Sequence, residues 1–143
     1  MSDEFMDSNV LVYLFDETDP RKYEIARNLT DEAIESGNGV ISFQVVQEVL
    51  NLLTTKFISP ASPDRAQEVL RDVLSPLWRV MPTEQLYQTA LAIRGRYGFD
   101  FYDSLIVAAA LLAGCSRLLT EDLQDGQRIE GLTIVNPFAE GRL

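Results

Sequence analysis

The chain has 143 residues, of which 22 are acidic and 12 basic, with no histidine and one cysteine. This length suits one domain with a substantial core, and the lack of histidine excludes Ser-His-Asp and Cys-His catalysis and any His-ligated zinc site. Cys115 alone can form neither an internal disulfide nor a Cys-based zinc site. What remains abundant is carboxylate, whose oxygen atoms suit hard cations such as Mg²⁺ or Mn²⁺.

The net charge of −10 argues against a partner that is bound through bulk electrostatics. Nucleic-acid-binding proteins usually carry a basic surface, so this balance counts against a nuclease. Of the 12 basic residues, however, 10 are arginine, the side chain best suited to bidentate phosphate contact. Arg94 and Arg96 lie close together before Asp103 and are candidates for contact with a nucleic-acid backbone.

The two longest apolar runs, residues 10–15 and 105–113, are far shorter than the roughly 20 residues that a membrane span needs. The first four residues include the acidic Asp3 and Glu4, whereas the start of a signal peptide is basic. We therefore expect a cytoplasmic protein without a membrane segment.

Short apolar segments alternate with longer amphipathic ones along the chain. Residues 5–6 read as a first strand that ends at Asp7, and Ser8 and Asn9 suit the start of a helix. Residues 10–15 fit a strand as well as a helix, because the run is short, apolar and rich in β-branched and aromatic residues. Further along, the pattern predicts helices over 20–36, 43–57, 64–74, 82–96 and 104–113, strands over 39–42, 77–81, 117–120 and 132–135, and a polar turn over 121–127.

Short strands separated by helices indicate an α/β fold with a parallel sheet that is covered on both faces. Ligands of such sheets bind at the carboxyl ends of the strands. Asp7 follows the first strand, and Thr120, Glu121 and Asp122 follow a later one. The fold class therefore brings these residues to one edge of the sheet.

The most apolar helix is predicted over residues 104–113, which are apolar on nearly every face and are followed by Gly114. Asp103 is the one charged residue between Phe101 and Cys115. It stands at the first turn of this helix, where unpaired N–H groups and the helix dipole favour an anion. Asp103 is thus either an N-cap or a functional carboxylate.

Glu48 flanks the apolar stripe of the helix predicted over residues 43–57. Taken alone it is an edge glutamate that reaches solvent, but a carboxylate beside a core face needs a partner. Together with Asp7, Asp103 and Asp122 it makes a set of four carboxylates. If the four carboxylates lay close together, their negative charges would repel and would raise one another's pKa. A bound divalent cation would neutralise this repulsion.

Four segments appear in the order and spacing of a PIN domain, namely residues 6–13, 47–51, 101–110 and 119–126, and residues 131–138 match the last strand of that family. The chain resembles the VapC-type toxin ribonucleases of type II toxin–antitoxin systems over nearly its whole length. The resemblance implies a three-layer α/β/α fold, a single PIN domain over residues 1–143, and a helix over residues 10–15. It also implies a Mg²⁺- or Mn²⁺-dependent endoribonuclease that is usually homodimeric and is held inactive by a cognate antitoxin.

Position by position, Asp7, Glu48, Asp103 and Asp122 match the acidic metal site of that family. Asp7 and Asp103 are then the principal ligands, and the other two complete the cage or position a water. The resemblance implies in-line attack by a metal-activated water on an RNA phosphodiester, which leaves 5′-phosphate and 3′-hydroxyl ends. Glu121 is read as a solvated neighbour, and the auxiliary candidates are Ser8, Asn9, Thr120 and Asp125.

Two other interpretations compete with the nuclease. The same fold with a metal site too weak for turnover would act as a module that binds RNA or a protein partner. A phosphatase of the haloacid dehalogenase type also begins with an aspartate at a strand end. It needs a second aspartate two residues later, where this chain has Asn9, and neither Lys22 nor Lys56 lies where its lysine is needed.

Overall fold

The computed structural model describes residues 2–55 and 59–140. Their strands form a six-stranded sheet in the order β3-β2-β1-β4-β6-β5, parallel throughout except for the last pair, β6 and β5. The predicted α/β class with a mainly parallel sheet is confirmed. The strands are β1 (Glu4–Met6), β2 (Gly39–Ser42), β3 (Trp78–Val80), β4 (Arg117–Leu119), β5 (Arg128–Ile129) and β6 (Leu132–Val135).

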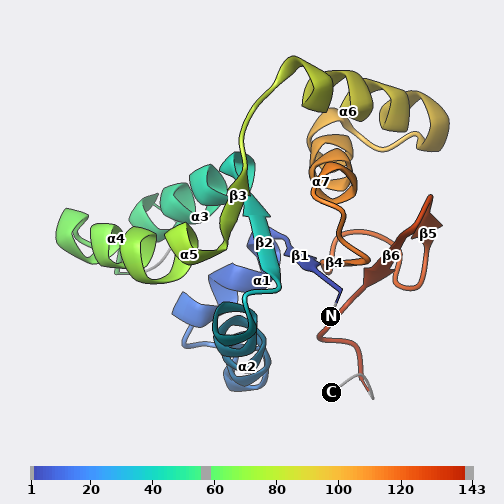
Figure 1. Cartoon of the computed structure of the whole chain (residues 1–143). Helices are drawn as coiled ribbons and strands as arrows, with labels where there is room; N and C mark the ends of the chain where they lie inside the picture. The colour runs from blue at the N-terminus through green and yellow to red at the C-terminus, as the bar shows by residue number, and fades with distance from the viewer. Residues whose placement is uncertain (1, 56–58, 141–143) are drawn as a thin grey trace.

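Helices cover both faces of this sheet (Figure 1). The helical segments α1 to α5 lie in the connections from β1 to β2 and from β2 to β3, whereas α6 and α7 lie in the connection from β3 back to β4. Crossovers between parallel strands are right-handed, and these two sets of connections run in opposite directions across the sheet. The first set of helices therefore covers one face of the sheet and the second set covers the other. The helices are α1 (Ser8–Leu11), the 3₁₀ helix η1 (Val12–Phe15), α2 (Pro20–Ser36), α3 (Phe43–Thr55), α4 (Pro63–Val69), the π-helical turn η2 (Leu70–Leu74), α5 (Ser75–Leu77), α6 (Glu84–Tyr97) and α7 (Phe101–Leu112).

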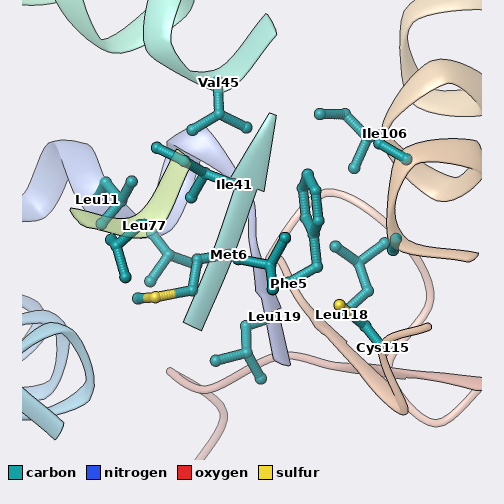
Figure 2. Packing of buried hydrophobic residues seen from close by; sticks show 14 of the residues in the cluster. Phe5, Met6, Leu11, Ile41, Val45, Leu77, Ile106, Cys115, Leu118 and Leu119 are labelled. Carbon is teal, nitrogen blue, oxygen red and sulfur yellow. The ribbon is translucent and has the colours of Figure 1, made fainter. Parts of the chain in front are cut away.

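Both faces of the central strands are buried, as a parallel sheet between two helical layers requires. In Figure 2, Phe5 of β1 points toward Ile106 of α7, whereas Met6 points to the other side, toward Leu77 of α5. Every residue of α7 from 104 to 110 is buried, which confirms the buried helix expected from its composition. No helix in the described ranges is both long and apolar enough to cross a membrane.

The start of α7 differs from the prediction. The helix begins at Phe101, and its N-cap is Asp100, whose Oδ1 accepts the Asp103 N–H at 2.8 Å. The interpretation of Asp103 as an N-cap is therefore wrong. Its carboxylate lies in the first turn and is not used to cap the helix, because Asp100 already accepts the N–H at the third helical position.

Other boundaries shift for local reasons. The helix expected over 64–74 begins at Pro63, with Ser62 as N-cap, and widens into a π-helical turn after Val69. The strand expected over 77–81 is the shorter β3. The sequence did not predict β5, because a strand of two residues is too short to show an alternating pattern. Residues 10–15 are helical, as the family resemblance implied. The predicted end of α3 at residue 57 lies outside the described residues.

Candidate active site

The carboxyl ends of three neighbouring strands carry the candidate residues. Strand β1 lies between β2 and β4, and Asp7 directly follows β1. The Asp7 N–H donates to the Leu119 carbonyl at 3.0 Å, which fixes this residue beside Thr120 at the end of β4. Glu48 is on α3, the helix that follows β2. The predicted edge of the sheet is thus where these side chains lie.

Asp7 is the most buried of the four carboxylates, with 6% of its surface exposed. Its Oδ1 accepts the Ser8 N–H at 2.7 Å, and its Oδ2 accepts the Thr120 hydroxyl at 2.9 Å and Asn9 Nδ2 at 3.3 Å. Burial raises the pKa of Asp7 to about 7 against the lowering effect of these hydrogen bonds. The negative charges of Glu48 and Asp122 contribute to this rise in pKa.

Ser8 connects Asp7 to Glu48. The Ser8 hydroxyl donates to Glu48 Oε1 at 3.0 Å and lies 3.4 Å from Asp7 Oδ1. Burial raises the pKa of Glu48, hydrogen bonds from Ser8 and Gln44 lower it, and the charges of Asp103 and Asp122 raise it. Glu48 therefore points into the acidic group and is not an edge glutamate that only reaches solvent.

The other two carboxylates of the group are Asp103, in the first turn of α7, and Asp122, in the turn after β4. Burial raises the pKa of Asp103, and so do the charges of Asp100 and Asp122. The Asp122 side chain is exposed, and its N–H donates to the Thr120 hydroxyl oxygen at 3.2 Å. Asp122 thus lies within electrostatic reach of the other three carboxylates, and Glu48 lies within reach of Asp7 and Asp103. The four carboxylates come from four different segments of the chain.

The fit to a metal ion can be judged from charge and donor type. Among the described residues, the hydrogen-bond donors to the buried Asp7 are the hydroxyls of Thr120 and Ser8, the Asn9 amide and the Ser8 N–H, with no cation among them. Carboxylates that raise one another's pKa suit a hard divalent cation. Among residues 2–55 and 59–140, however, no three acidic, histidine or cysteine side chains converge closely enough to form a ligand group. A cation bound by one or two of these carboxylates would complete its coordination with water.

The auxiliary candidates separate into two groups. Thr120 is fully buried, and its hydroxyl donates a hydrogen bond to Asp7. The same hydroxyl oxygen accepts a hydrogen bond from Asn9 Nδ2 at 3.0 Å. Asn9 Oδ1 in turn accepts the Glu121 N–H at 3.3 Å. These residues hold the end of β1 against the turn after β4. Asp125 Oδ1 instead accepts the backbone N–H of residue 136, so this carboxylate supports the start of the C-terminal segment.

A cavity of about 490 Å³ lies apart from this acidic group. It is bounded by η1, α2 and the beginning of α4, with Leu14, Tyr23 and Arg65 among its lining residues. None of the four carboxylates lines it. Asp16, Glu17 and Arg65 also line this cavity, but three of the four carboxylates in the acidic group have raised pKa values, so the acidic group is the candidate active site.

Comparison with known protein families matches residues 5–128 to the PIN domain. The chain belongs to the PIN domain family. PIN domains are in general nucleases, and PIN nucleases generally use divalent metal ions. A sequence search of curated proteins finds no match.

Solved structures share the fold of this PIN domain. A toxin–antitoxin complex from Klebsiella pneumoniae aligns with a TM-score of 0.67 at 23% identity, over 94% of this chain and 97% of the other. VapC20 of Mycobacterium tuberculosis, a toxin that cleaves the sarcin–ricin loop, aligns with a TM-score of 0.60 at 20% identity, over 83% and 91%. VapBC2 of Rickettsia felis, bound to a DNA fragment from its promoter, gives 0.62 at 19%, over 92% and 96%.

Glu121 is not the solvated neighbour that the sequence suggested. Its Oε1 accepts the Tyr13 hydroxyl at 2.6 Å, and its Oε2 lies 2.9 Å from Lys22 Nζ. Lys22 also donates to the Tyr13 hydroxyl at 3.1 Å and lies over the rings of Tyr13 and Phe138, 4.8 and 5.4 Å from their centroids. In this PIN domain the Glu121 contacts therefore tie the turn that carries Asp122 to η1 and α2. The residues involved are far apart in sequence, so no sequence pattern predicted their contact.

We expect Lys22→Met to destabilise the protein by about 1–2 kcal/mol, because it leaves the partly buried Glu121 carboxylate without its cation. Urea unfolding at neutral pH measures this loss. Lys22→Arg should retain most of the stability, and adding Glu121→Gln to Lys22→Met should cost less than the sum of the two single changes. Additive losses would contradict a direct Lys22–Glu121 interaction.

Proposed function

We propose that this PIN domain is a metal-dependent endoribonuclease and the toxin component of a toxin–antitoxin pair. The observation that carries the proposal is the buried Asp7 carboxylate at the end of β1, whose pKa is raised by burial and by the charges of Glu48 and Asp122. Perturbed carboxylates gathered at the carboxyl edge of a parallel sheet are typical of a functional site. Membership in a family of nucleases supports the reaction class.

In this proposal Asp7 and Asp103 are the principal metal ligands, with Glu48 and Asp122 as further ligands or holders of the attacking water. A bound Mg²⁺ or Mn²⁺ would lower the pKa of water and neutralise charge that develops on the phosphate. Ser8, Asn9 and Thr120 donate hydrogen bonds that keep Asp7 oriented and favour its ionised form.

Proton transfer then falls to a carboxylate, because the chain has no histidine. Glu48 suits this role, since burial raises its pKa above the usual value of a glutamate and the Ser8 hydroxyl donates to its Oε1. Its carboxylate would accept a proton from the water that attacks the phosphodiester in line. The products would be 5′-phosphate and 3′-hydroxyl ends.

The proposed partners are an RNA substrate, a cognate antitoxin and a second copy of the chain, with action in the cytoplasm. RNA is supported by the likeness to VapC20, which cleaves the sarcin–ricin loop. An antitoxin is supported by the likeness to the toxin–antitoxin complex from Klebsiella pneumoniae. The homodimer follows only from the habit of VapC-type relatives.

The first test is cleavage of end-labelled RNA by the purified protein in Mg²⁺, in Mn²⁺ or in EDTA. We expect cleavage in either metal, loss in EDTA, recovery when metal is restored in excess, and 5′-phosphate product ends. Cleavage that survives EDTA would contradict the mechanism.

A second candidate function is a PIN-fold module that binds RNA or a protein without turnover. It is favoured by one observation, the lack of a converged ligand group among the described residues. Binding of several structured RNAs without cleavage of any would support this module over the enzyme.

A further inference from the structure

Three aromatic side chains form a continuous run beside the acidic group. The rings of Tyr87 on α6 and Phe101 on α7 are nearly parallel, with centroids 6.5 Å apart and an interplanar angle of 12°. The ring of Tyr102 meets Phe101 edge-on, with centroids 5.4 Å apart. Tyr102 is 66% exposed and Tyr87 38%, so the run ends in a tyrosine ring that is largely open to solvent.

Tyr102 occupies a fixed position next to the candidate ligands. It immediately precedes Asp103 in the first turn of α7. Its carbonyl accepts a hydrogen bond from Gln44 Nε2 at 3.3 Å, and Gln44 lies one helical turn before Glu48 on α3. This hydrogen bond ties the first turn of α7, which carries Tyr102 and Asp103, to α3, which carries Glu48.

The charge of the chain favours an uncharged source of RNA affinity. With a net charge of −10, the bulk electrostatics of the chain oppose RNA binding, so affinity depends on local contacts. Lys22, the lysine nearest in sequence to the first motif, is already paired with Glu121. Stacking of a base on an aromatic ring needs no positive charge and tolerates any sequence, because every base has a π-face.

We propose that Tyr102, whose ring Phe101 meets edge-on, is a stacking platform for an unpaired nucleobase next to the scissile phosphate. This inference rests on the proposed nuclease function and adds its substrate class, a single-stranded segment of RNA. Bases in a duplex are already stacked on one another and cannot use such a platform.

The test compares native protein, Tyr102→Ala, Tyr102→Trp and the control Tyr23→Ala in cleavage of an end-labelled single-stranded RNA with Mg²⁺. Tyr23 is a partly exposed tyrosine on α2 that lines the separate cavity. We expect Tyr102→Ala to raise KM by about 5- to 150-fold with a smaller change in kcat, since stacking on one base is worth roughly 1–3 kcal/mol. Tyr102→Trp and Tyr23→Ala should keep the native KM.

Two further readouts distinguish stacking from damage to the site. Mn²⁺ affinity, measured by calorimetry, should be the same in Tyr102→Ala and native protein, because the carboxylates are unchanged. A duplex of the same sequence should be cleaved poorly by both proteins and show no sensitivity to Tyr102→Ala.

An unchanged KM in Tyr102→Ala, with native protein active, would overturn the platform and leave the nuclease intact. If that variant kept its KM but lost a self-associated state in sedimentation, Tyr102 would belong to a protein contact and the platform would again be overturned. Native protein that neither binds nor cleaves the single-stranded RNA would overturn the nuclease and the platform together.

Discussion

We expect the Asp7→Asn variant to be more stable than the native protein at pH 8 in EDTA, although it alters a buried, fully hydrogen-bonded residue. The pKa of Asp7 is raised from 3.8 to about 7 in the folded protein. That difference sets a ceiling of about 4 kcal/mol on the destabilisation caused by its charge. Asparagine removes the charge and can still accept the Ser8 N–H.

The gain in unfolding free energy should be about 1–3 kcal/mol, which is smaller than this ceiling. The amide nitrogen of the new asparagine takes the place of Asp7 Oδ2 and cannot accept the hydrogen bond from Asn9 Nδ2. The sign of the pH dependence follows from the raised pKa. The folded protein holds the Asp7 proton more tightly than the unfolded chain, so the native protein loses stability as pH rises from 3.8 to about 7. The advantage of Asp7→Asn should therefore be larger at pH 8 than at pH 5.

Urea unfolding at both pH values measures this effect, and Asp31→Asn is the matched control. Asp31 is exposed on α2, and its contact with Arg27 is long, at 3.8 Å, so Asp31→Asn carries the same change in net charge without burial. Its stability should stay within about 0.5 kcal/mol of native. If Asp7→Asn were less stable than native protein at pH 8, the hydrogen bonds of Asp7 would outweigh its desolvation.

Asp103→Asn should reduce RNA cleavage in Mg²⁺ by at least about 100-fold, since loss even of a group that only supports a metal ligand costs 10- to 100-fold. The metal-free variant should melt at or above the native temperature, because the charges of Asp100 and Asp122 repel Asp103. Initial cleavage rates and thermal melting in EDTA measure the two effects. A clear fall in melting temperature would give Asp103 a structural role instead.

Asp100→Asn is the matched control for Asp103→Asn. It removes the same charge three residues earlier and keeps the cap of α7, because asparagine caps helices as well as aspartate does. We expect cleavage within a few-fold of native protein. Equal losses in both variants would show that the charge of the first turn matters and that Asp103 has no particular role.

Periodicity and composition predicted most of the elements. The boundaries of α2 and β2 match the prediction residue for residue. Pro20 at the start of α2 and Gly37, left-handed at its end, are helix signals that depend on local sequence. The burial of α7 followed from its composition alone. The start of α7 was misplaced by three residues, since Asp100 and Asp103 are equally good caps and the extended backbone at Asp100 decides between them.

The acidic site could be predicted in part. Parallel topology places Asp7 and Thr120 at one edge, and their direct hydrogen bond agrees with that expectation. The interaction of Glu121 with Tyr13 and Lys22 could not be predicted, because those residues lie 108 and 99 positions away and a charged residue in a turn usually faces water.

The sequence by itself determined the alternation of strands and helices, the buried α7 and the reliance on carboxylates in a chain without histidine. Local patterns carry this information because backbone hydrogen bonding and burial repeat with the period of each element. Only the tertiary structure decided that Asp7 is the desolvated carboxylate, that Asp100 caps α7 and that Lys22 holds the turn of Asp122 through Glu121. Desolvation and pairing depend on side chains from distant segments, and these meet only when the sheet and its two helical layers have formed.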